Sequence, residues 1–157
     1  MNPNIRAATG KDLEAVLELE RVGYDSDHFG RRQFRYLLTK ANAVTLVIDG
    51  EQGIVGMCMV AFHRGSSSCR IYNITVHPGH RRKGYAKILL EEAERLAISR
   101  GANVMRLEVR DDNDIAISFY ERYGFVRGER KRNYYDGGKS AWVYRKRLTS
   151  AGNTVTW

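Results

Sequence analysis

A short basic loop, between an apolar segment and an amphipathic one, could bind a phosphate group. It lies in TVHPGHRRKGYAKILLEEAERL, Thr75 to Leu96, where Arg81 to Lys83 come directly before Gly84. A helix that begins near Gly84 would present backbone N–H groups without intrahelical partners, and the positive end of its dipole. Glycine lets an anion approach the main chain, and the small Ala86 keeps the first turn uncrowded. The pattern predicts a diphosphate site made largely of main chain, and the alternative is an ordinary basic turn before a helix.

The spacing of Gly79 and Gly84 matches the G-x-x-x-x-G of a nucleotide-binding P-loop, but the following residues exclude that site. A P-loop continues with Lys and then Ser or Thr, whereas Tyr85 and Ala86 follow here. Without the hydroxyl that binds Mg²⁺ and without that lysine, the loop does not predict an NTPase.

Other residue types that support catalysis lack a suitable setting. Cys58 and Cys69 lie in apolar, strand-like segments and are expected to be buried free thiols in a reducing cytosol. His77 and His80 are close in sequence, but no further ligands lie nearby, so no metal is expected. The G-x-S-x-G pattern of a serine nucleophile is absent from the sequence. A covalent mechanism is therefore not expected.

Length and composition predict one globular domain. The chain has 157 residues and 43% hydrophobic content, enough for a single core. We expect a domain over residues 1–148 and a loose tail over residues 149–157. No apolar run approaches the roughly 18 residues of a membrane span, and the polar start MNPNIRAATGKDLE is not a secretory signal. A cytoplasmic protein without membrane contact is expected.

The net charge of +8 predicts an anionic partner. Much of the surplus is concentrated in Arg81 to Lys83 and Arg127 to Arg132. It could suit a polyanionic cofactor, an acidic protein surface or nucleic acid. Because no nucleic-acid module is recognisable, nucleic acid is not expected to be the primary partner.

The hydrophobic periodicity predicts an α/β domain around a mixed, mostly antiparallel sheet. Helices are expected after a Thr9–Asp12 capping box, near residues 31–40, from about Gly84 to Gly101, and after an Asn113 N-cap. Strands are expected over residues 4–7, 43–62 (a hairpin turning at DGEQG), 70–76, 104–110, 125–130 and 141–148. The β-α-β unit from residues 71 to 109 should supply the one parallel pair.

Three segments in order resemble the GCN5-related N-acetyltransferases (GNAT). VHPGHRRKGYAKILL is similar to their acetyl-coenzyme-A motif, Gln/Arg-x-x-Gly-x-Gly/Ala, here with Arg81, Gly84 and Ala86. LEVRDDNDIAISFYERYGF looks like their second signature, a strand and an Asn-initiated helix ending in Tyr-x-x-x-Gly-Phe. RNYY and its glycine-bearing turn resemble the C-terminal hairpin of the ribosomal-protein-alanine acetyltransferases (RimI-like). The resemblance spans Ile5 to Leu148 and implies a single-domain GNAT fold: a seven-stranded sheet, about four helices, and a strand splay that holds acetyl-CoA.

The resemblance also implies which residues contact acetyl-CoA. The pantetheine arm should pair with the main chain where the strands splay, at Ile74, Thr75 and Val76. The pyrophosphate should sit beside Arg81 on a run of backbone amides: Arg82, Lys83, Gly84, Tyr85, Ala86 and Lys87. Asn113 should hydrogen-bond the arm or the adenosine side. It could equally cap its helix, and both roles can hold.

The implied reaction is direct attack of an amine on the thioester, in a ternary complex. Glu108 lies on the strand face opposite Leu107 and Val109, and RimI-like enzymes carry a glutamate at the matching position as the base. The alternative is a structural ion pair of Glu108 with a neighbour such as Arg106 or Arg110.

Three tyrosines complete the implied site. Tyr120 matches the general acid and should stabilise the departing thiolate by hydrogen bonding, and the alternative is an aromatic core residue. Tyr134 and Tyr135 should clamp the acceptor peptide.

The acceptor itself is left open by the sequence. An N-terminal α-amine is the first hypothesis, although GYDSDHFGRRQFRYLL lacks the Pro-Trp-Ser-like stretch often found there in the RimI-like subfamily. A small amine, such as a polyamine, amino acid or antibiotic, is the second hypothesis. A non-catalytic acyl-CoA-binding or nucleic-acid-binding protein is the third. The chain could be a monomer or a homodimer.

Overall fold

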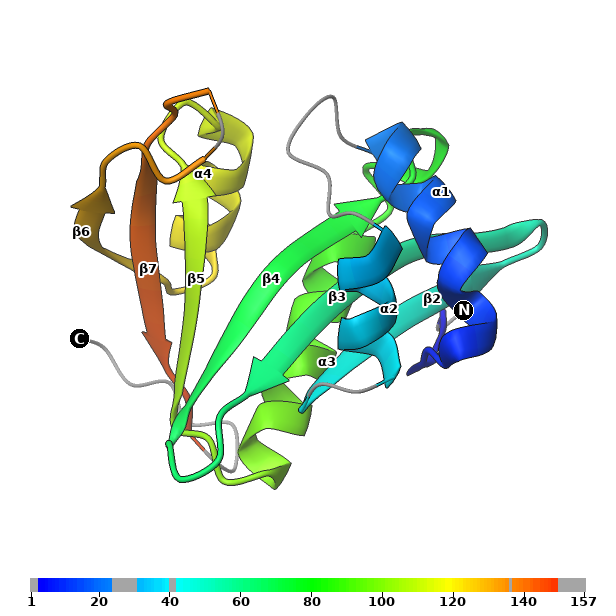
Figure 1. Cartoon of the computed structure of the whole chain (residues 1–157), viewed down its shortest axis with the longest axis horizontal. Helices are drawn as coiled ribbons and strands as arrows, with labels where there is room; N and C mark the ends of the chain where they lie inside the picture. Colours follow the sequence, from blue (N-terminus) through cyan, green and yellow to red (C-terminus); the bar gives the residue numbers. More distant parts are fainter. Residues whose placement is uncertain (1–2, 24–30, 40–41, 136, 150–157) are drawn as a thin grey trace.

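The structure, a computed structural model, describes residues 3–23, 31–39, 42–135 and 137–149. The predicted element order is confirmed over these residues, and Figure 1 shows the arrangement. The strands are β1 (Asn4–Ala7), β2 (Ala43–Gly50), β3 (Gly53–Phe62), β4 (Ser68–Val76), β5 (Val104–Arg110), β6 (Val126–Lys131) and β7 (Ala141–Arg147). The helices are α1 (Leu13–Gly23), α2 (Arg31–Thr39), α3 (Tyr85–Ser99) and α4 (Asp114–Arg122), with short 3-10 helices at Gly10–Asp12 and Pro78–His80.

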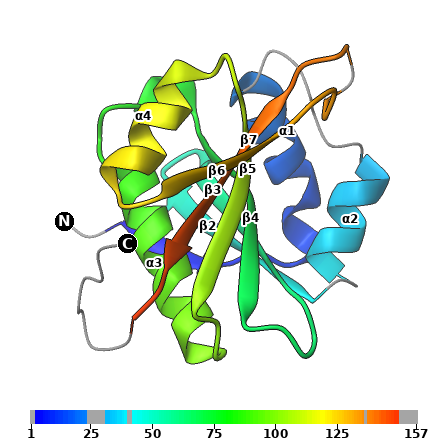
Figure 2. The same ribbon diagram turned by 90° about the vertical axis from the view of Figure 1, so that its left-hand side faces the viewer.

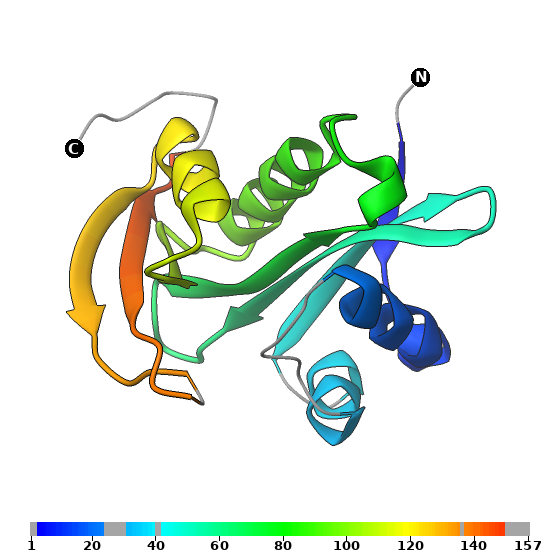
Figure 3. The same ribbon diagram turned by 90° about the horizontal axis from the view of Figure 1, so that it is seen from above.

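The seven strands form one sheet in the order β1-β2-β3-β4-β5-β7-β6. Each neighbouring pair is antiparallel except β4 and β5, the pair that the β-α-β unit was predicted to supply. Helices α1 and α2 cover one face, and α3 and α4 cover the other (Figures 2 and 3). The predicted mixed sheet with four flanking α-helices is therefore confirmed for the described residues.

The first helical segment differs slightly from the prediction. The capping box is present: the backbone N–H of Thr9 donates to Asp12 Oδ2 over 2.8 Å, and the Thr9 hydroxyl accepts from the backbone of Lys11. It caps the 3-10 turn Gly10–Asp12, and α1 begins only at Leu13. Arg6 on β1 contacts Asp12 and so ties this turn to the sheet edge.

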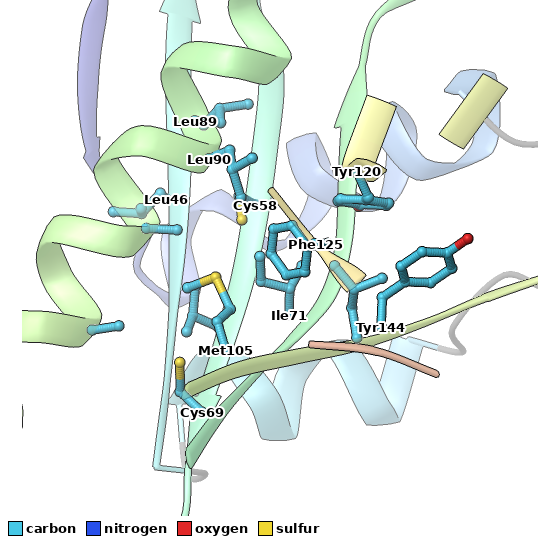
Figure 4. Packing of buried hydrophobic residues seen from close by; sticks show 14 of the residues in the cluster. Leu46, Cys58, Cys69, Ile71, Leu89, Leu90, Met105, Tyr120, Phe125 and Tyr144 are labelled. Carbon is cyan, nitrogen blue, oxygen red and sulfur yellow. The ribbon is translucent and has the colours of Figure 1, made fainter. Parts of the chain in front are cut away.

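Two hydrophobic clusters lie on opposite sides of the sheet. The larger cluster joins the strands to α3 and α4, and Figure 4 shows part of it, including Cys58, Cys69 and Tyr120. Both cysteines are free and buried, as predicted. Burial raises the pKa of the Cys69 thiol to about 11 and that of Cys58 further still. Neither thiol is therefore activated as a nucleophile.

The parallel pair is short, and its end determines where a site can form. The register of β4 with β5 covers only Ser68–Arg70 against Val104–Arg106, and beyond it the two strands separate (Figure 1). Opposite β3, the register shifts between Met59 and Val60, so that Tyr72 is an extra residue in β4. Such a bulge bends its strand and increases its twist. The bend helps β4 to leave β5 immediately after Arg70.

Within the described residues, no helix has the length and apolar character that crossing a membrane requires. The same residues contain no group of three His, Cys, Asp or Glu side chains that could hold a metal ion. The predicted tail begins at residue 149, and residues 150–157 lie outside the described part of the chain.

Candidate active site

The loop predicted to bind phosphate leads into a helix at the expected glycine. Gly84 is the N-cap of α3, in the left-handed conformation with φ 78°. A side chain there would be strained by this φ, although a Cβ would meet no atom within 4 Å. Within the described residues no side chain caps α3, so its first N–H groups lack a side-chain acceptor. Arg81, Arg82 and Lys83 are exposed beside this opening, which suits a phosphate group.

The loop is held from both sides by contacts that sequence reasoning missed. The Nδ1 of His77 accepts a hydrogen bond from the backbone of Gly79 over 3.0 Å. The Nη2 of Arg81 donates to the carbonyl of Gly23, at the end of α1, over 3.3 Å. The Arg81 side chain therefore spans from the loop to α1. The sequence motif relates Arg81 only to Gly84, so it could not predict this contact with a distant residue.

Residues Ile74 to Val76 line the separation of the two strands. On one edge they pair with β3, at Cys58, Met57 and Gly56. The register with β5 on the other edge has already ended at Arg70. Thr75 is buried towards α1, whereas Ile74 packs against the core on the α3 side. The predicted splay is thus present at the predicted residues.

The N-cap role of Asn113 is confirmed. Its Oδ1 accepts a hydrogen bond from the backbone N–H of Ala116 over 3.2 Å, in the first turn of α4. A contact of the same side chain with a ligand stays a prediction.

Tyr120 lies in the core on the α3 and α4 side of the sheet. It is 8% exposed, and its ring meets Phe119 and Phe125 edge to face, at centroid distances of 5.3 and 5.4 Å. Figure 4 shows Tyr120 close to Phe125. The ring is thus a core residue, as the alternative interpretation held, and a chemical role for its hydroxyl stays a prediction.

Glu108 is a buried carboxylate surrounded by cations. Its side chain is 3% exposed, and its Oε2 accepts a hydrogen bond from Arg70 Nε over 2.9 Å. Arg106 Nη2 lies 3.4 Å and Lys131 Nζ lies 3.6 Å from the other oxygen, Oε1. Neither contact is a hydrogen bond, and Oε1 is a buried acceptor without a hydrogen-bond partner among the described residues. One oxygen of the carboxylate is therefore held by a hydrogen bond, and the acceptor capacity of the other is not used by the described residues.

The ion pair that the sequence offered as the alternative role of Glu108 is present in part. Arg106 contacts Glu108, but Arg110 pairs with Asp112, at 2.5 Å. The main partner is Arg70, which sequence reasoning missed because it lies 38 residues away on β4. The only available signal was a charged residue inside an apolar strand.

The sheet register explains why these charges meet. Glu108 and Arg106 are two residues apart on β5, so both point away from the core face of Leu107. Arg70 and Arg106 are direct partners in the last pair of the parallel ladder. Like charges at this distance repel, and the carboxylate between them offsets the repulsion. The Arg70 guanidinium also lies 4.5 Å from the ring centre of Tyr72, the bulge residue.

Of the two tyrosines predicted to clamp the acceptor, Tyr134 contacts Arg70, the hydrogen-bond partner of Glu108. Its hydroxyl accepts a hydrogen bond from Arg70 Nη2 over 2.6 Å, and Lys131 Nζ lies 5.3 Å from its ring centre. Tyr135 packs at 90° to Tyr134, at a centroid distance of 4.9 Å. Arg70 therefore links the loop after β6 to the carboxylate on β5.

Similarity to known proteins covers most of the chain. Residues 11–125 match the family described as "Acetyltransferase (GNAT) family". The chain belongs to the GNAT family. Over 129 residues it is 30% identical to the [ribosomal protein bS18]-alanine N-acetyltransferase of Salmonella typhimurium, covering 79% of this chain and 81% of that protein. An acetyltransferase of Yersinia pestis is 37% identical over 82 residues, which span 51% of this chain and 55% of that relative.

The GNAT fold is also clear from a solved structure. The ribosomal-protein-S18-alanine N-acetyltransferase from Escherichia coli superposes with a TM-score of 0.84 at 23% identity, over 99% of this chain and all of that one. The predicted family and the RimI-like resemblance are thereby confirmed.

Proposed function

We propose that this GNAT protein transfers an acetyl group from acetyl-CoA to the N-terminal α-amine of a peptide or protein. The observation that carries this proposal is the buried Oε1 of Glu108, which accepts no hydrogen bond among the described residues and lies beside the separation of β4 and β5. A buried acceptor without a donor costs free energy, so it is expected to meet a donor in the working complex. The N–H of an acceptor amine, or a water bound to it, is such a donor.

The residues at the opening fit acetyl-CoA. The main chain of Ile74, Thr75 and Val76 would pair with the pantetheine arm along the edge that β5 leaves. The backbone amides of residues 82–87 would hold the diphosphate, and Arg81 and Asn113 would contact the cofactor beside them. The open space around a Cβ position at Gly84 and the exposed cations beside it support this diphosphate site. When bound, acetyl-CoA supplies an acetyl thioester.

The chain's own residues would then orient the reactants and move one proton. The amine nitrogen attacks the thioester carbon, the new C–N bond forms and the C–S bond breaks. Glu108 Oε1 accepts the proton that the nitrogen loses, directly or through water. The Tyr120 hydroxyl donates a hydrogen bond to the departing sulfur, and supplies a proton where transfer is complete. Glu108 lies on the face of β5 opposite the core that contains Tyr120, which is consistent with separate roles for the two groups at the amine and at the sulfur.

An α-amine suits this site better than a lysine side chain. The ordinary pKa of an α-amine is about 7.7–8.0, so a fraction is already neutral at pH 7. A lysine amine at about 10.4 must give up its proton at a cost of about 4.6 kcal/mol. Three cations within 4.0 Å of Glu108 would further repel a charged ammonium group, and a polyamine most of all.

A screen of acceptors tests the proposal. Consumption of acetyl-CoA would be followed with three sets: peptides with varied free N-termini, the same peptides with blocked N-termini and one internal lysine, and small amines. We expect transfer to free N-termini, with mass spectrometry locating the acetyl group on the α-nitrogen. Glu108→Gln, which keeps the shape but not the basicity, should lose most of this activity.

Two results would contradict the proposal. Efficient acetylation of small amines but of no peptide would show that the acceptor is a small amine and not a peptide N-terminus. No heat of binding with coenzyme A or acetyl-CoA in the millimolar range would remove the reaction altogether.

A further inference from the structure

The charges around Glu108 point to a preference among acceptor peptides. We propose that Arg70, Arg106 and Lys131 select N-termini with an acidic side chain at the first or second residue. This inference rests on the proposed function and specifies its substrate class. It comes from the balance of charge at the site, since three cations converge on a single carboxylate.

The surplus positive charge is local. Arg70 has Glu108 Oε2 as its hydrogen-bonded anion, so Arg106 and Lys131 share the remaining oxygen at 3.4 and 3.6 Å. Within the described residues, Glu108 is the only carboxylate that forms an ion pair with either of these two side chains. Both cations therefore have unused capacity to bind an anion.

Among the described residues, neighbouring charges do not cancel this surplus. Arg145 on β7 pairs with Glu129 on β6 at 2.7 Å, and Arg130 on β6 pairs with Asp111, the residue after β5, at 2.7 Å. These two pairs are neutral in sum. On the other side of the separation, Glu20 of α1 is buried and accepts a hydrogen bond from Asn73 over 3.0 Å. The carboxyl group of Glu20 therefore faces β4 and is shielded from solvent.

The three cations are partly exposed to solvent, whereas the carboxylate is not. The side chains of Arg70, Arg106 and Lys131 are 23%, 35% and 39% exposed, and that of Glu108 is 3% exposed. An incoming peptide therefore meets positive charge before it reaches Oε1. A lysine or arginine near its N-terminus would be repelled, and an aspartate or glutamate would be attracted.

The distances around Glu108 Oε1 limit which residue of the peptide can bind Arg106 or Lys131. With the amine at Glu108 Oε1, the nearest cationic nitrogens lie 3.4 and 3.6 Å from that same atom. An extended peptide advances at most about 3.6 Å per residue. A carboxylate close enough to bind Arg106 or Lys131 therefore belongs to the first or the second residue, and residues further along should have little effect.

The test compares three acceptor peptides of equal length, which differ only at the second residue: Ala-Glu, Ala-Ala and Ala-Lys. For the wild-type protein we expect kcat/KM to fall in that order, by roughly threefold to tenfold between the first and last, as for partly exposed charge pairs. High salt should compress the difference because it screens these charges. Lys131→Gln should weaken the preference, and Lys131→Glu should reverse it.

A matched charge change provides the control. Lys11→Glu alters the net charge by the same amount on an exposed 3-10 turn that precedes α1, remote from Glu108. It should leave the order of the three peptides unchanged. Arg106→Gln, with thermal unfolding measured for each variant, provides a second route should Lys131→Glu fail to fold.

The outcomes separate the two proposals. Equal kcat/KM for the three peptides, or an order that Lys131→Glu does not alter, would overturn charge selection while peptide acetylation stands. Acetylation of free glutamate and aspartate, but of no peptide, would overturn the peptide acceptor proposed above and, with it, the N-terminal class named here. Activity towards none of these acceptors would contradict the proposed function itself.

Discussion

Arg70 and Glu108 form an ion pair across the point where β4 and β5 separate, with Arg70 Nε 2.9 Å from Glu108 Oε2. Arg70 is the last residue of β4 in register with β5, and Glu108 lies two residues beyond its register partner, Arg106. The pair therefore holds one carboxylate oxygen at the base of the opening. The second oxygen remains without a hydrogen-bond donor among the described residues.

This arrangement predicts that Arg70 positions the proton acceptor. Arg70→Met should lower kcat by up to about 100-fold, because a small misplacement of a reacting group can cost that much. KM for the peptide should change less. Arg70→Lys should retain part of the rate, and guanidinium ions at millimolar concentration should restore part of the rate of Arg70→Met.

Arg95→Met is the matched control, because it removes an arginine that forms an exposed ion pair with Glu92 on α3. Its kcat should match the wild type and should not respond to guanidinium. An Arg70→Met protein with the wild-type rate would show that the ion pair is only structural.

Removing the hydroxyl of Tyr120 should slow the reaction. Tyr120→Phe keeps the ring that packs between Phe119 and Phe125, so the fold and the affinity for acetyl-CoA should be preserved. We expect kcat to fall on the order of 100-fold, as for the loss of a general acid. Single-turnover kinetics and calorimetry with coenzyme A would measure the two effects separately.

Tyr144→Phe serves as the comparison for Tyr120→Phe. The Tyr144 hydroxyl donates to Glu121 over 2.7 Å and accepts from Arg127 over 2.9 Å. Its loss should reduce stability by about 1 kcal/mol without changing the chemical step. Equal kcat in Tyr120→Phe and wild type would exclude Tyr120 from the chemistry.

A methyl group at Gly84 should weaken cofactor binding. Its φ of 78° makes alanine unfavourable by about 1–2 kcal/mol, and the added Cβ would lie in open space at the start of α3, where we propose that the diphosphate binds. We expect Gly84→Ala to raise the dissociation constant of coenzyme A about tenfold, measured by calorimetry. Gly101→Ala carries the same backbone strain, at φ 85° and with open space around the Cβ, at the other end of α3. Gly101→Ala should lower the stability but not the affinity for coenzyme A. An equal loss of this affinity in both variants would contradict the phosphate site.

Acid should destabilise the fold through Asp12. A hydrogen bond from Arg6 lowers the pKa of Asp12 to about 2, below its ordinary value of 3.8. Because the folded-state pKa is the lower one, this stabilisation is complete above about pH 4 and is lost as the pH falls towards 2. Asp12→Asn should reduce the free energy of unfolding by about 1–2 kcal/mol at pH 7 and by little at pH 2, in urea titrations.

Asp112→Asn offers the exposed counterpart to Asp12→Asn. Hydrogen bonding to Arg110 also lowers the pKa of Asp112, but this side chain is 45% exposed. Solvent screening should make its effect on stability much smaller. Equal effects of the two substitutions would contradict a specific role for the Arg6–Asp12 pair.

Local patterns were sufficient for much of the fold. The capping residues Thr9 and Asn113, and the glycine before α3, act within a few residues of their own position. Strand and helix periods likewise depend on nearest neighbours. One helix boundary differs from the prediction, because α1 begins only after a 3-10 turn. This turn contacts a separate element through the ion pair of Asp12 with Arg6 on β1.

The sequence by itself determined the family, the element order, the glycine-bearing loop before α3 and the candidacy of Glu108, because each depends on residues that lie close together along the chain. Only the tertiary structure decided what surrounds Glu108. Arg70 is 38 residues from Glu108 and 64 residues from Tyr134, and a register between distant strands brings them together. Pairing of β4 with β5, the bulge at Tyr72 and the position of β6 depend on the packing of the whole sheet. Electrostatic environments arise from such long-range contacts, and no spacing along the chain encodes them.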